Sequence, residues 1–447
     1  MAFAELDLLR AEISGLGAAR SVGRVCEVAA GTIMATGLSA RAALGDRVAL
    51  YTRAGLRLGG EVLALHAGRV ALLADGAADG IAIGDRVELA GQGVIAPDPS
   101  WVGRIIDPFG RPLDGRPILR GRHERPLRAS PPPAAQRRRL GARLETGIRA
   151  FNTLLPLVRG QRIGLFSGSG VGKSSLLAKF ARGVDAEVVV IALVGERGRE
   201  LREFVEGVLG PEGMARAVVV AATSDLSPLV RRRCAWAAMA VAEYFRDQGR
   251  HVLYLADSVT RFAEAHREVA LAGGEPPSLR GYPPSTAHQI MALGERAGPG
   301  PEGAGDITAV FSVLVAGSDM EEPVADILRG VLDGHVVLDR AIAERGRFPA
   351  IDLLRSVSRS LPGAASAPQN ALIMQARRLL GAYDRAELMI QAGLYAPGSD
   401  ALVDAALRVW PALDAFLAED EPGSTADSFA RLAACLAAAD DGGGSPS

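Results

Sequence analysis

Short β-like runs, broken by glycine and Gly-Asp turns, fill the chain from residue 21 to about residue 95. Regularly spaced short strands with turn signals between them predict a small β-barrel. The expected strands are at residues 22–28, 47–51, 60–65, 70–73 and 85–89. Barrels that bind oligonucleotides use basic and aromatic side chains, and Tyr51 is the single aromatic residue of this stretch, which favours a structural barrel.

Near-continuous apolar runs alternate with helical patterns from residue 144 to about residue 361. Such runs are typical of buried parallel strands in a doubly wound α/β sheet. The expected strands are at residues 162–166, 187–194, 217–222, 251–256 and 307–315. Beyond residue 369 the pattern predicts helices at residues 371–381, 401–416 and 424–439, and the glycine-rich end at 441–447 is expected to be disordered.

The first 20 residues and residues 120–143 each permit two interpretations. Leu6, Leu9, Ile13 and Leu16 recur at helical spacing and predict a short amphipathic helix, which either docks on the protein's own body or binds a partner helix. Residues 120–143 are rich in proline and arginine. They are favoured as a solvated linker, and the alternative is a contact to a substrate or a neighbouring subunit.

The composition narrows the class of protein. A length of 447 residues is enough for several domains, and a net charge of −1 argues against a protein that mainly coats nucleic acid. Three cysteines at unrelated spacings suggest neither a disulfide framework nor a zinc site, which fits a reducing cytoplasm. No signal peptide and no run of about 18 apolar residues is seen, so we expect a soluble protein whose membrane role is peripheral.

A glycine-rich loop at residues 167–175 follows a predicted strand and precedes a predicted helix, which is the context of a nucleotide-binding P-loop. Backbone N–H groups of such a loop surround phosphate oxygens, a lysine neutralises the β/γ-phosphates, and a hydroxyl binds Mg²⁺. Only two of the 50 basic residues are lysines, so retention of one at position 173 indicates a need for a compact ammonium. The predicted nucleotide-binding residues are Gly168, Ser169, Gly170, Val171, Gly172, Lys173, Ser174 and Ser175.

Carboxylates follow two neighbouring predicted strands. Asp257 ends the strand at 251–256, where the ligands of α/β sheets bind, so it is a candidate for the Mg²⁺ water shell; a helix cap is the alternative. The strand at 187–194 leads into Gly-Glu-Arg-Gly-Arg-Glu at 195–200. A carboxylate there would orient the attacking water, and an arginine would offset phosphate charge.

These features together resemble the hexameric ATPase family that includes the rotary ATP synthase α and β subunits, the Rho terminator and the ATPases of flagellar and type III protein export. The motifs that carry the resemblance are Gly-Arg-Ile-Ile-Asp at 103–107, Gly-Arg-Pro-Leu-Asp-Gly at 110–115, Thr-Gly-Ile-Arg-Ala at 146–150, the loop at 167–175, the run at 195–200, Asp-Ser-Val-Thr-Arg at 257–261 and the run at 349–359 that ends in Ser-Val-Ser-Arg. They span about residues 20–400 in the family's order. Ser167 departs from the strict loop pattern, which has glycine there.

The resemblance implies a division into an N-terminal partner-binding helix (1–20), a β-barrel domain (21–95), a RecA-like ATPase domain with a mainly parallel sheet (96–368) and a C-terminal helical domain (369–440). By the family's motifs, Glu196 resembles the carboxylate that polarises water and Arg197 its phosphate-contacting neighbour. Glu200 resembles a carboxylate near the metal shell, as Asp257 does. Arg359 resembles an arginine finger that reaches an adjacent subunit.

Two aromatic residues match positions that pack on the adenine ring in relatives. They are Phe348 and Tyr395, and an ordinary core position is the alternative for each. The expected ligands of the whole site are ATP and Mg²⁺.

The residues of further motifs match the export branch of the family. These are Glu-Tyr-Phe-Arg-Asp-Gln-Gly at 243–249, Gly-Glu-Pro-Pro at 274–277, Arg-Gly-Tyr-Pro-Pro-Ser at 280–285, Asp-Met-Glu-Glu-Pro-Val-Ala-Asp at 319–326 and Gly-Leu-Tyr-Ala-Pro-Gly-Ser-Asp at 393–400. The implied function is ATP hydrolysis by a ring that energises flagellar protein export. A virulence injectisome ATPase, a Rho-like RNA translocase and a non-catalytic ring subunit are the alternatives.

The resemblance to the export branch also implies partners. They are other copies in a hexamer, a regulatory stator-like protein at the N-terminal helix, an export gate and chaperone–substrate complexes, with no nucleic acid. The implied location is the cytoplasm, peripherally at the export apparatus of the inner membrane.

Overall fold

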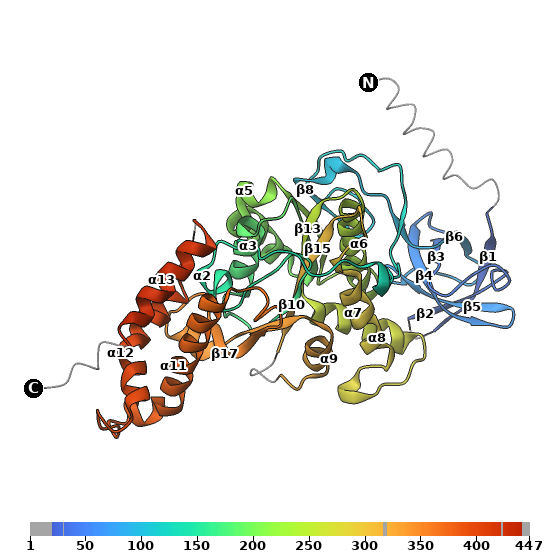
Figure 1. The fold of residues 1–447 in the computed structure, drawn as a ribbon. Coiled ribbons are helices and arrows are strands. Elements are labelled where there is room, and N and C mark those ends of the chain that lie inside the picture. The colour runs from blue at the N-terminus through green and yellow to red at the C-terminus, as the bar shows by residue number, and fades with distance from the viewer. Residues whose placement is uncertain (1–19, 30, 316–319, 422, 440–447) are drawn as a thin grey trace, which may run out of the picture.

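The computed structural model describes residues 20–439 except residues 30, 316–319 and 422. The predicted N-terminal helix, apart from Arg20, and the predicted disordered tail at 441–447 lie outside the described residues. A β-barrel lies at one end of the molecule, an α/β unit in the middle, and a group of helices at the other end (Figure 1). In the described part of the chain, no helix combines the length and the apolar character needed to cross a membrane.

Six antiparallel strands close into the barrel in the order β1-β2-β5-β4-β3-β6. Their bounds are β1 Val22–Ala29, β2 Thr32–Thr36, β3 Arg47–Tyr51, β4 Arg57–His66, β5 Arg69–Ala74 and β6 Arg86–Gly91. Five of them were predicted, and β2 was missed because only Ile33 and Ala35 of its five residues alternate into the core. Ile33, Leu50 and Leu72 are fully buried at the centre of the barrel.

The central sheet runs in the order β17-β16-β10-β15-β13-β11-β12-β8, with β14 paired beside β15. Its strands are β8 Arg104–Ile106, β10 Arg162–Ser167, β11 Val188–Glu196, β12 Ala217–Thr223, β13 His251–Asp257, β14 Gly298–Pro299, β15 Asp306–Leu314, β16 Gly334–Leu338 and β17 Ile351–Ser358. The five predicted strands are its buried centre and pair in parallel. The prediction of a mainly parallel sheet is confirmed, and β17 pairs antiparallel with β16 at one edge.

Both faces of this sheet are covered, because side chains of successive strand residues point to opposite faces. In β11, Val189, Ile191 and Leu193 belong to the core that includes helix α3 (Lys173–Gly183). Val190 and Ala192 belong to the core formed with helices α6 (Pro228–Asp247) and α7 (Val259–Ala272). The near-continuous apolar runs that predicted these strands are therefore the result of burial on two sides.

Three long helices end the described part of the chain. They are α11 Ala367–Gln391, α12 Ala401–Phe416 and α13 Thr425–Ala437, and they continue the core of the α3 face. Helix α11 is longer than the predicted run at 371–381, since a capping box between Ser366 and Gln369 starts it earlier and Gly381 is accommodated within it. Other helices of the α/β unit are α4 Gly198–Arg202, α8 Ser285–Arg296, α9 Pro323–Val331 and α10 Arg340–Glu344.

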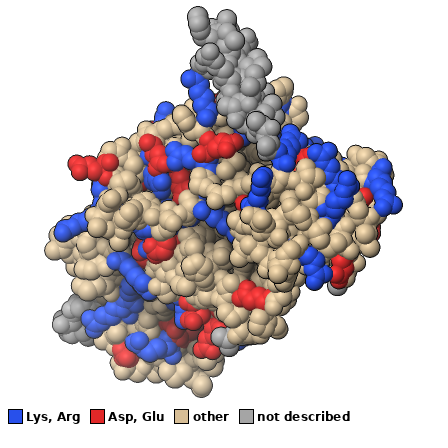
Figure 2. Space-filling view, turned by 90° about the vertical axis from the view of Figure 1, so that its right-hand side faces the viewer, with Lys and Arg blue, Asp and Glu red and all other residues tan. Residues whose placement is uncertain are grey.

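Residues 120–143 are not the solvated linker that their composition favoured. Arg128 donates to Glu61 of the barrel at 2.7 Å, and Arg138 donates to Asp306 of the central sheet at 2.6 Å. The segment is therefore attached to two parts of the molecule by its arginines. The end of the molecule that carries the barrel shows basic and acidic side chains interspersed over its surface (Figure 2).

Candidate active site

The predicted P-loop connects β10 to α3 at the carboxyl edge of the sheet. Gly170 and Gly172 adopt left-handed backbone conformations, with φ values of +78° and +84°. A side chain at position 170 would meet no atom within 4 Å, so the loop is open on this side. Glycine is needed at both positions because other residues are strained at such φ values, and the result is a loop whose N–H groups are able to face an anion.

The loop borders a cavity of about 680 Å³. Parallel pairing brings the ends of β10, β11 and β13 to this edge, with Ser167 opposite Leu314 and Leu193 opposite Asp257. The cavity is lined by Gly168, Ser169, Gly170, Gly172, Lys173, Ser174, Ser175, Gly195, Glu196, Arg197, Glu200, Ser224, Arg231, Arg261 and Leu314. Most of the predicted site residues are thus brought together around one polar cavity.

Lys173 and Asp257 form a buried ion pair at the base of the loop. Asp257 also accepts a hydrogen bond from Ser312 at 2.9 Å, which fixes its carboxylate at the end of β13. An ammonium in this position is available to phosphate oxygens, because a triphosphate in the cavity would compete with Asp257 for it. The alternative role of Asp257 as a helix cap is not what the structure shows, since Ser258 caps α7.

Glu196 ends β11 beside this ion pair. Burial raises its pKa to about 7, the negative charge of Asp257 adds to the rise, Lys173 opposes it, and Glu200 raises it further. A carboxyl that titrates near neutral pH and borders a phosphate-sized cavity is suited to interact with a water molecule during hydrolysis.

Arg197 and Glu200 start the following helix and are more exposed. Arg197 contacts Glu200 at 3.3 Å, and 78% of its side chain is exposed in this chain alone. The arginine is therefore placed at the mouth of the cavity rather than inside it. It lies where a bound phosphate or a neighbouring subunit could engage it.

Sequence reasoning missed two arginines of the cavity, Arg231 and Arg261. Arg261 lies in the first turn of α7, four residues after Asp257, and donates to Glu264 at 2.9 Å. The hydrogen bond to Glu264 is the main reason why its pKa is raised, and the charges of Glu196 and Glu200 contribute, which places it within their field. The sequence signal that could have identified Arg261 is its place at the end of the Asp-Ser-Val-Thr-Arg motif at 257–261.

The two predicted adenine-contacting residues are placed differently. The ring of Phe348 lies against Gly172, where an added Cβ would be 3.0 Å from it. Tyr395 is partly buried beside the helical core and donates its hydroxyl to Asp404 of α12 at 2.9 Å. The structure therefore brings Phe348 to the loop, whereas the contacts of Tyr395 are made with the C-terminal helices.

Arg359 lies at the opposite edge of the sheet from its own P-loop. In β16, Leu338 pairs with Ser167 next to the loop, whereas Gly334 pairs with Ser358, the neighbour of Arg359. Four residues of β-strand separate these two positions, which is about 13 Å. An arginine at this edge is far from the phosphate cavity of its own chain.

The donors around the loop suit Mg²⁺ bound together with a nucleotide. Ser174 supplies a hydroxyl, and Glu200 and Asp257 supply carboxylates near it. Within the described residues, no three His, Cys, Asp or Glu side chains are grouped as a metal site of their own. Mg²⁺ is usually bound by only a few hard oxygen donors of the protein, and phosphates and water fill its other coordination positions.

Comparisons with known proteins agree with this geometry. A family model described as the ATP synthase alpha/beta family, nucleotide-binding domain, matches residues 147–358, and one described as the T3SS EscN ATPase C-terminal domain matches residues 365–434. The flagellum-specific ATP synthase of Caulobacter vibrioides is 46% identical over 423 residues, which cover 93% of this chain and 95% of that protein. This chain belongs to the ATP synthase alpha/beta family.

Other proteins are similar to this chain over most of their length. The flagellum-specific ATP synthase of Salmonella typhimurium is 42% identical, with 92% of each chain covered. The solved structure of the assembled ATPase EscN from the type III secretion system of enteropathogenic E. coli matches with a TM-score of 0.84 and 36% identity, over 93% of this chain and all of that one. The predicted fold and the predicted export branch are confirmed, and the protein is a P-loop ATPase.

Proposed function

We propose that this ATPase hydrolyses Mg²⁺-ATP as a ring-shaped oligomer and energises the export of flagellar proteins through a type III secretion apparatus. The observation that carries the proposal is that Lys173 and Glu196 line one cavity, with the buried Asp257 in an ion pair with Lys173, in a chain 46% identical to a flagellum-specific ATP synthase. The division into a barrel, an ATPase domain and a helical domain at 21–95, 96–368 and 369–440 is part of this proposal.

In the proposed reaction, the N–H groups of the loop and Lys173 hold the β- and γ-phosphates. Glu196 accepts a hydrogen bond from water, directs its oxygen in line onto the γ-phosphorus and takes up its proton as the new O–P bond forms. The bond between the γ-phosphorus and the bridging oxygen breaks, and ADP leaves with the electron pair on that oxygen. Arg197 and Arg261 offset the charge that spreads over the γ-phosphate oxygens. Mg²⁺, held by Ser174 with Asp257 and Glu200 nearby, would supply further positive charge at the same oxygens.

Arg359 completes the site of a neighbouring subunit in this proposal. Its place at the opposite edge of the sheet from its own loop supports this role, because it is remote from its own phosphate cavity and exposed to a neighbour. EscN has been solved in an assembled form and in a complex with its central stalk EscO. By analogy we propose a hexamer here, with a stalk or stator-like regulatory partner, an export gate and chaperone–substrate complexes, acting in the cytoplasm at the inner membrane.

An injectisome ATPase is the second candidate. It is supported by the match of residues 365–434 to the EscN C-terminal domain. The flagellar function is favoured because the relatives with 42–46% identity are flagellum-specific ATP synthases, whereas EscN is 36% identical.

Deletion of the gene in the bacterium that carries it tests the choice between flagellar export and an injectisome. We expect flagellin to disappear from the culture medium, to return with the wild-type gene and not to return with Lys173→Ala. The measurement is flagellin in the medium relative to flagellin in the cells. Normal flagellin export together with loss of a virulence effector would favour the injectisome instead.

The pKa of Glu196 predicts a pH dependence of hydrolysis. The free site has this pKa at about 7, and the deprotonated carboxylate is the form that accepts a hydrogen bond from water. The value of kcat/KM for ATP should therefore fall about tenfold per pH unit once the pH is well below 7, and level off above 8. Steady-state rates between pH 5.5 and 9 provide the check, with circular dichroism at each pH as the control for folding; a kcat/KM that is constant between pH 5.5 and 8 would contradict the assignment.

A further inference from the structure

The cavity at the P-loop extends past Glu196. Along the edge of the sheet that carries the site, β10 is followed by β15, β13, β11 and β12. Glu196 ends β11, and Ser224, which also lines the cavity, comes directly after β12. Neighbouring strands lie about 4.8 Å apart, so this part of the cavity is about one strand spacing further from the P-loop than Glu196.

Arg231 supplies a positive charge in this part of the cavity. It lies in the first turn of α6 and lines the cavity together with Ser224. Its side chain runs beside the backbone that carries Glu196, because a Cβ added to Gly195 would lie 3.6 Å from the Cδ atom of Arg231. The side chain of Arg231 is 15% exposed. A guanidinium is therefore held next to Glu196, in the part of the cavity that follows β12.

The guanidinium of Arg231 has a partner that an anion is able to replace. Its Nη2 donates to the two carboxylate oxygens of Glu268 of α7 at 3.0 and 3.2 Å, and its Nε donates to the carbonyl of Leu226 at 3.0 Å. Its Nη1 makes no hydrogen bond to any other residue that the structure describes. The side chain of Glu268 is 46% exposed, and ion pairs with an exposed partner are weak. A doubly charged anion in the cavity therefore competes with Glu268 for Arg231.

The direction of the reaction places the product phosphate near Arg231. In an in-line displacement, water attacks the γ-phosphorus from the side opposite to ADP, and the phosphorus moves towards the attacking oxygen. Glu196 orients that water, so the new phosphate forms beside Glu196 and away from ADP. At that point Glu196 has taken up a proton and carries no negative charge, while Lys173 remains with Asp257 and the phosphates of ADP. A cation beyond Glu196 is therefore well placed to hold the product.

We infer that Arg231 and Ser224 form a subsite for inorganic phosphate, the product of hydrolysis. Arg231 binds the phosphate after the bond to ADP has broken, and Glu268 recovers the guanidinium as the phosphate leaves. This inference rests on the proposed function, in which ATP is hydrolysed at the P-loop. It makes Arg231 a product-binding residue that has no part in the attack of water.

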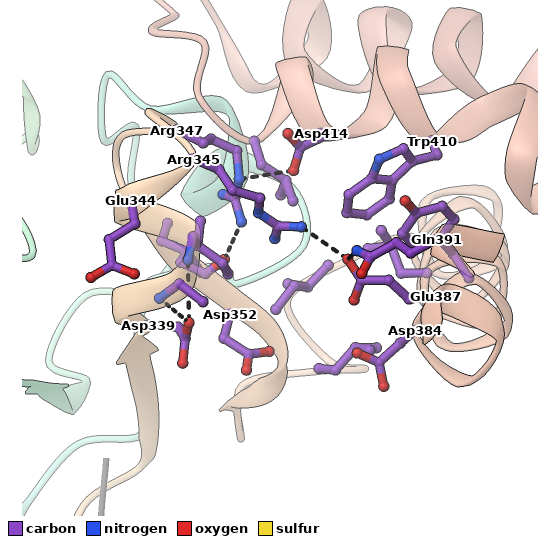
Figure 3. A pocket seen from close by; sticks show the side chains of 18 of the residues that line it. Asp339, Glu344, Arg345, Arg347, Asp352, Asp384, Glu387, Gln391, Trp410 and Asp414 are labelled. Atoms are coloured by element: carbon purple, nitrogen blue, oxygen red, sulfur yellow. Dashed lines mark hydrogen bonds and ion pairs between the residues drawn. The ribbon is translucent and has the colours of Figure 1, made fainter. Parts of the chain in front are cut away.

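A second cavity shows why volume alone does not indicate a phosphate site. It measures about 520 Å³ and lies between residues 339–354 and helices α11 and α12 (Figure 3). Arg345 pairs there with Glu387 at 3.1 Å. Arg347 pairs with Asp414 at 2.9 Å. Four further carboxylates line this cavity, from Asp339, Glu344, Asp352 and Asp384. Carboxylates thus outnumber basic side chains by six to two here, whereas four basic side chains and two carboxylates line the cavity at the P-loop.

Arg231→Met tests the inference, because it removes the charge and keeps most of the length of the side chain. The measurement is equilibrium binding of radiolabelled inorganic phosphate to the protein saturated with Mg²⁺ and ADP. We expect the dissociation constant of phosphate to rise about tenfold or more, as for the loss of a hydrogen bond to a charged group. The KM for ATP should change by less than about twofold, because Arg231 binds the phosphate only after the reaction.

Glu268→Gln should act in the opposite direction. It removes the competing charge and leaves Arg231 in place, so phosphate should bind about two- to fivefold more tightly. A purely structural role of the ion pair predicts weaker binding in both variants. Arg345→Met and Glu387→Gln break the matched ion pair of the second cavity and should leave the dissociation constant of phosphate unchanged.

Circular dichroism and binding of a fluorescent ADP analogue check that each variant is folded. Unchanged phosphate binding in Arg231→Met would overturn the inference. Weaker binding in Glu268→Gln would also overturn it, and this variant decides the question if Arg231→Met does not fold. Failure of the wild type to hydrolyse ATP would refute the proposed function. A wild type that hydrolyses ATP, but whose ADP complex binds phosphate no better than that of Arg231→Met, would refute the subsite alone.

Discussion

Replacement of Glu196 by glutamine is expected to reduce ATP hydrolysis by about 10²–10⁴-fold, the usual contribution of a positioned general base. Glutamine keeps the size of the side chain and its position at the end of β11, but its amide has no basic oxygen at neutral pH. Nucleotide binding should persist or become tighter, since the variant removes a negative charge near the phosphates. The pH dependence centred near 7 should disappear together with the activity.

The measurement is steady-state phosphate release with Mg²⁺-ATP, combined with equilibrium binding of a fluorescent nucleotide. Glu203→Gln is a suitable control, because Glu203 is an exposed carboxyl in the next part of the same chain segment and does not line the cavity. A Glu196→Gln protein that binds nucleotide and still hydrolyses it at more than a tenth of the wild-type rate would contradict the assigned role.

The centre of the fold was predictable from sequence because buried strands are recognisable by their apolar residues. Strands such as β11 and β13 are covered on both faces, so almost every residue in them is apolar. The edge strands were not predicted. β17 is partly exposed and carries Asp352, Arg355 and Ser356 among its apolar residues, and β16 is only five residues long. A short, mixed polar and apolar sequence of this kind cannot be distinguished from a loop without knowledge of the strand that it pairs with.

The site was predictable where one motif carries the chemistry and unpredictable where chemistry depends on packing. The P-loop glycines, Lys173, Glu196 and Asp257 are local signals. The structure places the loop and Glu196 on one cavity and pairs Asp257 with Lys173. Arg231 lies on α6 and reaches that cavity only through the crossing of helix and sheet, so no local pattern indicates it. The attachment of residues 120–143 was likewise not predictable, because the carboxylates that pair with its arginines lie in distant parts of the chain.

Two inactive variants are expected to regain activity when they are mixed. Arg359→Ala should lose about 10³-fold or more in hydrolysis, within the range known for arginine fingers. Glu196→Gln is inactive for a different reason, since it lacks the carboxylate but carries an intact Arg359. If Arg359 acts on a neighbour, an interface between an Arg359→Ala subunit that supplies Glu196 and a Glu196→Gln subunit that supplies Arg359 has every required group.

Random mixing of the two variants in equal amounts makes such an interface in roughly a quarter of cases, so recovery of up to about a quarter of wild-type activity is expected. The position of Arg359, about 13 Å of strand away from the edge that carries its own loop, is the reason to expect recovery.

The mixture is assembled at high protein concentration, and its rate is compared with the sum of the separate rates. Four control mixtures combine each of the two variants with itself and with Lys173→Ala. Lys173→Ala also supplies an intact Arg359, so it should rescue Arg359→Ala in the same way, whereas it should not rescue Glu196→Gln, because each of those two variants damages the P-loop side of the site. No recovery in any mixture, with the subunits shown by light scattering to assemble together, would mean that Arg359 does not complete a neighbour's site.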